Sequence, residues 1–135
     1  GQAEEVEALV QHWLLSAVSF YDTAAHSPPE RFYHGFVLGL LVDLSGSHLV
    51  TSNRESGYGR CDVLLTPRKP GSPGVALELK VPDKRRDQTV KQALEAAHSQ
   101  IRERDYAAAL RAAGASPIHS LALVFDGKEV HVSAA

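Results

Sequence analysis

The sequence is poor in cysteine and in long apolar runs, and each shortage excludes a class of protein. Its single cysteine, Cys61, cannot form an internal disulfide and lacks the partners of a thiolate zinc site, so a reducing, cytoplasmic location is expected. No apolar run approaches the length needed to span a bilayer, and the acidic residues 2–7 are unlike a signal peptide. Secretion and membrane partners are therefore not expected.

The chain also lacks the excess of positive charge that most nucleic-acid-binding domains carry. Its 14 Lys and Arg residues against 16 Asp and Glu residues give a formal net charge of -2. This balance argues against nucleic-acid binding driven by electrostatics alone. It remains compatible with an enzyme that handles phosphate through a local basic strip and a bound divalent cation.

Length and composition favour one compact domain. The chain has 135 residues, of which 44% are hydrophobic and 22% are charged, and it shows no internal repeat. These values are close to those of ordinary globular proteins and allow a single core. We expect one domain over residues 1–135, with an N-terminal helix within 1–25 and a core over 29–135. The chain is also compatible with being a piece of a longer protein.

Apolar spacing and turn residues predict the order helix, helix, three strands, helix, two strands. The helices are expected at about 3–21, from the Ser27-Pro28-Pro29 break to about 44, and at 87–112. The strands are expected near 48–53, 60–67, 74–81, 118–125 and 129–132, the last two flanking an Asp126-Gly127 turn. This order predicts an α/β sandwich with a central mixed sheet of about five strands flanked by helices.

Two charged residues interrupt the apolar strand expected at 74–81. Period-two alternation places Glu78 and Lys80 on one face of this strand, and Leu77 and Leu79 on the other. Charges within a strand that is otherwise fit for burial are costly unless they are paired or bound to a metal. The plainer interpretation is an ordinary Glu78–Lys80 ion pair on a solvent-facing strand.

The preceding strand carries one acid, Asp62, in a similar apolar run. If the connecting turn is centred near Pro70, Asp62 lies opposite Glu78. Directly paired residues have Cβ atoms about 4.5–5.5 Å apart, which is destabilising for two carboxylates unless a cation lies between them. Mg²⁺ prefers one or two carboxylates together with water and phosphate oxygens. Asp62 and Glu78, with Lys80 beside them, therefore predict a site for Mg²⁺ or Mn²⁺.

The motif formed by Asp62 and Glu78-Leu79-Lys80 resembles that of the PD-(D/E)xK nuclease superfamily. The likeness extends to Glu30–Gly35, Ser52–Asp62, Gln100-Ile101 with Tyr106, and Phe125–Lys128. Together these stretches are similar to the branch often found C-terminal to an AAA-type ATPase-like domain. Cys61 departs from the proline in the superfamily's name, a position that is often relaxed.

The resemblance implies a restriction-endonuclease-like core and metal-dependent hydrolysis of nucleic-acid phosphodiester bonds, with DNA as the expected substrate. It implies that Asp62 and Glu78 bind the metal and that Lys80 orients water or stabilises phosphate charge. It adds Gln100 and Glu30 as catalytic members carried by helices. By its spacing, Gln100 borders a buried helix face, whereas the helix macrodipole alone also explains Glu30. An AAA-type ATPase-like domain and a second copy of the chain are the expected protein partners.

Basic residues and a glycine-rich turn suggest a nucleic-acid surface. Arg54, Arg60 and Lys84 belong to a set of cations able to follow a phosphate backbone, and Tyr58 lies in a glycine-rich loop. A solvated basic cluster and a simple glycine turn are the plainer interpretations.

Two other functions stay open. One is a non-catalytic module that keeps the nuclease fold and binds nucleic acid or a protein partner, which the negative charge favours. The other is a metal-dependent hydrolase of small phosphoesters or nucleotides.

Overall fold

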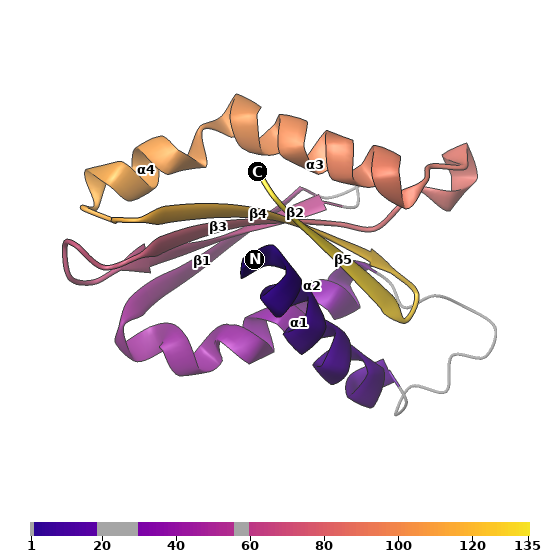
Figure 1. Cartoon of the computed structure of the whole chain (residues 1–135), viewed down its shortest axis with the longest axis horizontal. Coiled ribbons are helices and arrows are strands. Elements are labelled where there is room, and N and C mark those ends of the chain that lie inside the picture. The colour runs from indigo at the N-terminus through magenta and orange to yellow at the C-terminus, as the bar shows by residue number, and fades with distance from the viewer. Residues whose placement is uncertain (1, 19–29, 56–59) are drawn as a thin grey trace.

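The computed structural model describes residues 2–18, 30–55 and 60–135. Five strands form one sheet with the spatial order β1-β2-β3-β4-β5, and helices cover both of its faces (Figure 1). Only β3 and β4 run parallel, whereas the other neighbouring pairs are antiparallel. The predicted mixed five-stranded sheet is confirmed. Its strands are β1 (His48–Glu55), β2 (Arg60–Pro67), β3 (Gly74–Lys80), β4 (Ile118–Asp126) and β5 (Glu129–Ala134).

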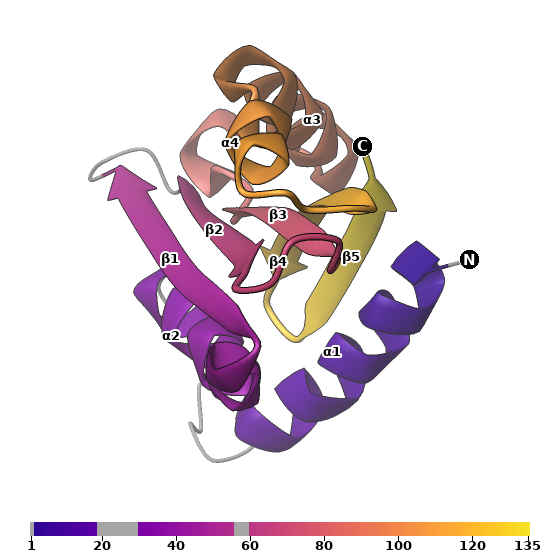
Figure 2. The same ribbon diagram turned by 90° about the vertical axis from the view of Figure 1, so that its left-hand side faces the viewer.

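Helices lie on both sides of the sheet (Figure 2). One side carries α1 (Gln2–Val18) and α2 (Glu30–Leu41), and the other carries α3 (Val90–Arg104) and α4 (Tyr106–Ala112). Short 3-10 turns, η1 (Val42–Gly46) and η2 (Lys84–Arg86), lead into β1 and α3. The expected break at Ser27-Pro28-Pro29 lies outside the described residues. No helix of the described ranges is long and apolar enough to cross a membrane.

The prediction of one helix over residues 87–112 is wrong in two respects. It starts at Val90, because Asp87 adopts a left-handed conformation with φ 51 and Thr89 forms a capping box with Gln92. It is also divided at Asp105, which has φ 46 and separates α3 from α4. The left-handed residue redirects the chain, so that Tyr106 begins a new helix.

The hairpin between β4 and β5 is confirmed, but its turn is shifted by one residue. Asp126 still belongs to β4 and pairs with Glu129, so the two loop residues are Gly127 and Lys128. Gly127 has a φ of 62, a conformation that glycine adopts without steric cost.

Residues alternate along β3 between two cores. Leu77 and Leu79 pack toward α1 and α2, whereas Ala76 packs toward α3 and α4. The first core is larger and contains the bulkier side chains. Its buried members are Val10, Leu14, Tyr33, Val37, Val63, Leu77, Leu79, Leu121, Leu123, Phe125 and Val130.

The two edges of the sheet differ in their cover. Helix α1 lies along β5, where Glu7 Oε2 accepts a hydrogen bond from Val132 N (2.8 Å) and Gln11 Oε1 accepts one from Val130 N (2.9 Å). Along β1, residues 51–53 are exposed. Side chains therefore occupy backbone donors of β5 that would otherwise be available to another strand.

Candidate active site

Asp62 and Glu78 are direct partners in the antiparallel pairing of β2 with β3. The register predicted from the turn near Pro70 is therefore confirmed. Both side chains are on the sheet face covered by α3 and α4, because their neighbours along the two strands, Val63 and Leu77, belong to the opposite core. Lys80 is two residues from Glu78 on β3 and so shares this face.

The acids are almost completely buried. Glu78 is 1% exposed and Asp62 is 7% exposed, and Gln100 of α3, at 8%, also lies among the buried polar side chains. Gln100 shares the buried stripe of α3 with Ala93, Ala97 and Ile101, as its spacing predicted. Lys80 is partly buried. The fold thus places two carboxylates and an ammonium on one face of the sheet, and a buried amide on the helix that covers this face.

Tyr106 links the two acids. Its hydroxyl donates a hydrogen bond to Asp62 Oδ2 at 2.6 Å and lies 3.3 Å from Glu78 Oε2. Oxygen atoms of both carboxylates therefore lie within hydrogen-bonding distance of one phenol oxygen. Burial, the hydrogen bond to Asp62 and the negative charges of both acids raise the pKa of Tyr106, so the hydroxyl keeps its proton.

Arg104, the last residue of α3, adds positive charge beside Asp62. Its Nη1 lies 3.5 Å from Asp62 Oδ2, and its side chain is 26% exposed. No role was predicted for Arg104, and Tyr106 was expected only within a stretch that resembles the family. One signal was available for Arg104, because it follows Gln100 by four residues and therefore shares its side of the helix. Tyr106 reaches the acids only because α3 ends at Asp105.

The remaining predicted residues lie elsewhere or beyond what the structure describes. Glu30 begins α2, and Arg54 and Arg60 lie near the ends of β1 and β2, but the description excludes their side chains. Tyr58 lies outside the described residues. Lys84, in η2, has its Nζ 2.8 Å from Asp126 Oδ1 and is 63% exposed. The roles of these residues stay predictions.

The residues at the acid pair fit a divalent cation that is shared with a substrate. Over 2–18, 30–55 and 60–135, no three His, Cys, Asp or Glu side chains form a group that could hold a metal ion. Mg²⁺ needs fewer protein ligands than this, since it is usually held by one or two carboxylates with water and substrate phosphates. Asp62 and Glu78 supply that number, and their oxygens approach a common point at Tyr106 Oη.

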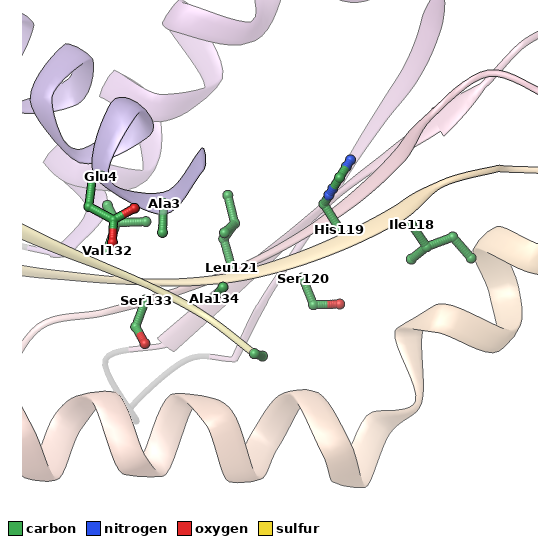
Figure 3. Close-up of a pocket in the computed structure, with 10 residues that line it drawn as sticks. Ala3, Glu4, Ile118, His119, Ser120, Leu121, Val132, Ser133 and Ala134 are labelled. Atoms are coloured by element: carbon green, nitrogen blue, oxygen red, sulfur yellow. The ribbon is translucent and has the colours of Figure 1, made fainter. Parts of the chain in front are cut away.

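A pocket of about 460 Å³ lies at another part of the sheet, where β4 begins and β5 ends. Figure 3 shows His119 and Leu121 on one side of the sheet, and Ser120 and Ser133 on the other. Its polar side chains therefore do not converge on one point. None of the residues predicted for the active site lines this pocket.

A mixed sheet between helices, with an acid pair and a lysine on adjacent central strands, defines a restriction-endonuclease-like α/β fold. The family model of the PD-(D/E)XK nuclease superfamily matches residues 28–134, which include all five strands and α2 to α4. The chain belongs to this superfamily, as its motifs predicted. A comparison with curated proteins gives no match. The expected AAA-type ATPase-like partner stays a prediction.

Proposed function

We propose that this protein is a nuclease that hydrolyses nucleic-acid phosphodiester bonds, with DNA as its substrate and Mg²⁺ or Mn²⁺ as its cofactor. The observation that carries the proposal is the pairing of Asp62 with Glu78 at 7% and 1% exposure. Two paired, buried carboxylates repel each other unless a proton or a cation lies between them. An apolar pair would stabilise the fold better, so these acids point to a function.

Each residue has a distinct role in this proposal. Asp62 and Glu78 hold the cation through their carboxylate oxygens. When bound there, the cation would lower the pKa of a coordinated water and neutralise charge that develops on the phosphate. Lys80 stabilises the same phosphate charge or orients the water, and Gln100 joins the site from α3. Glu30 is assigned to the site by the resemblance alone, because it begins α2, which covers the opposite face of the sheet. A water molecule releases a proton to solvent as its oxygen bonds to phosphorus, the bond to the leaving oxygen breaks, and the leaving oxygen takes up a proton from solvent.

The broader setting rests on composition and resemblance. Arg54, Tyr58, Arg60 and Lys84 would contact the nucleic acid. We also propose one domain over residues 1–135 and a cytoplasmic location. The proposed protein partners are an AAA-type ATPase-like domain or a second copy of the chain.

The test is cleavage of single- and double-stranded DNA and RNA with Mg²⁺ or Mn²⁺. Wild type is compared with Glu78→Ala and Lys80→Ala, and Glu95→Ala serves as the control because Glu95 is exposed on α3. We expect cleavage by the wild type and the control, and its loss in the other two variants. Equal activity in all four proteins would contradict the proposal.

The main alternative is a nuclease-fold module that binds nucleic acid or a protein without cleaving. The net charge of -2 and the contacts of Tyr106 and Arg104 with the acids favour it, since these contacts stabilise the carboxylates without a cation. Calorimetry separates the two. Absence of heat with Mg²⁺ or Mn²⁺, together with tight binding of DNA or self-association, would support the module.

A further inference from the structure

The acid pair is part of a row that continues onto the edge strand. In the pairing of β1 with β2, Asn53 is the direct partner of Asp62, which in turn is the direct partner of Glu78. Directly paired residues point to the same side of a sheet. Exposure increases along the row, from Glu78 at 1% through Asp62 at 7% to Asn53, which is exposed. The row therefore opens toward solvent at β1.

The helices above the sheet leave this end open. Helix α3 makes its main contacts with β3 and β4, and α4 makes its main contacts with β2, β3 and β4. Figure 2 shows β1 at an edge of the sheet, away from α3 and α4. Residues 51–53 are also exposed, so among the described residues the row is most accessible at β1.

The chemistry of Asn53 suits a contact with the substrate backbone. The NH2 group of its side chain has two donor hydrogens, so it can donate to a phosphate oxygen, and unlike a carboxylate it adds no negative charge beside Asp62. In register, its Cβ lies about 4.5–5.5 Å from that of Asp62, which is within one side-chain length. Contacts of this kind fix the register and orientation of a nucleic acid without reading its sequence.

We propose that Asn53 positions the substrate by donating a hydrogen bond to a phosphodiester oxygen next to the bond that is cleaved, so that the nucleic-acid strand crosses β1. This inference rests on the proposed nuclease function and deepens it. It assigns the open end of the acid row as the entry side for the substrate.

The test compares Asn53→Ala and Asn53→Asp with Ser52→Ala. Ser52 is a matched control, because it is the adjacent exposed residue but pairs with Val63, whose side chain belongs to the opposite core. KM and kcat for oligonucleotide cleavage and the Kd of a labelled oligonucleotide are measured with Mg²⁺. We expect Asn53→Ala to raise KM and Kd about tenfold with little change in kcat, since it removes a hydrogen bond to a charged group. Asn53→Asp should weaken binding further through repulsion, and Ser52→Ala should match the wild type.

Salt dependence separates a neutral contact from a change in the basic surface. Because asparagine carries no charge, the slope of log Kd against log salt should be the same in Asn53→Ala and wild type. Wild-type Kd in Asn53→Ala, or equal losses in Asn53→Ala and Ser52→Ala, would overturn the inference. Lack of cleavage by the wild-type protein would instead contradict the nuclease proposal. In that case the Kd values would still test whether Asn53 contacts the nucleic acid.

Discussion

The two faces of β3 perform different tasks, although they belong to the same short strand. On one face, Leu77 and Leu79 are 6% and 3% exposed and join the core beneath α1 and α2. On the other face, Glu78 pairs with Asp62 beneath α3 and α4, and Lys80 shares this face. Glu78 and Leu79 are both almost completely buried, but only the burial of the leucine side chain stabilises the fold. Stability and chemistry should therefore respond to different substitutions in neighbouring positions.

Glu78→Gln should give the largest effect and should act on activity alone. The amide keeps the size of the side chain but removes one of two charges that would hold a cation. Because a bound metal supplies several kcal/mol of transition-state stabilisation, we expect cleavage to fall by about a thousandfold or more. The free energy of unfolding should be unchanged or higher, since repulsion with Asp62 is relieved. Cleavage rates and urea unfolding measure the two quantities, and a strongly destabilised variant would contradict the separation of faces.

Leu79→Ala should give the reverse result. It leaves a cavity in the core of the opposite face and should lower the free energy of unfolding by about 2–5 kcal/mol. The cleavage rate per folded molecule should stay close to that of wild type. Urea unfolding and cleavage below the unfolding midpoint check this, and loss of activity in fully folded protein would show that the faces are coupled.

Tyr106→Phe removes the hydroxyl that lies between the two acids. Without the hydroxyl, Asp62 and Glu78 lose their shared donor, so the metal-free protein should be destabilised by about 1–3 kcal/mol. Excess Mg²⁺ should recover part of this loss, because a cation can take the place of the donor between the carboxylates. Thermal unfolding with and without Mg²⁺ measures the effect. The same loss in both conditions would argue against metal binding at the pair.

The smallest expected effect is a change in how stability depends on pH, and it comes from Tyr33 on the apolar side of the sheet. Burial, aided by the charge of Asp126, raises the pKa of Tyr33 from 10.0 to about 12, and its hydroxyl donates to Gly127 O at 2.8 Å. Because the folded pKa exceeds the unfolded one, this contribution is fully present below pH 10 and is lost as the pH rises through about 12. Tyr33→Phe should therefore lose less stability than wild type between pH 9 and 12. The free energy of unfolding of both proteins is measured between pH 9 and 12. The same dependence on pH in the two proteins would contradict this.

The acid pair could be predicted from the sequence because its position depends only on residues that are close together in the chain. Period-two alternation and the length of one turn are enough to set Asp62 opposite Glu78, and both are readable from residues 60–81. The same rules gave the strand bounds to within about two residues. The family motifs extended this result to the fold.

The contacts around the acids were harder to predict. The left-handed Asp105 lies between Arg104 and Tyr106 in a stretch rich in alanine, where helix propensity alone favours one continuous helix. Tyr106 contacts the acids because α4 packs on β2 and β3, and such tertiary packing leaves no short-range pattern. The entry side at Asn53 likewise depends on which strand the helices leave open.

Helix α1 covers β5 but lies outside the residues that match the family. This helix precedes the matched residues 28–134, yet Glu7 and Gln11 bind amides of β5, and Val10 and Leu14 fill the larger core. A polypeptide cut at the start of the match would present a bare strand edge beside an unfilled apolar groove. Such a surface recruits further chains by strand addition, so the shortened protein would polymerise or precipitate although its acid pair was intact.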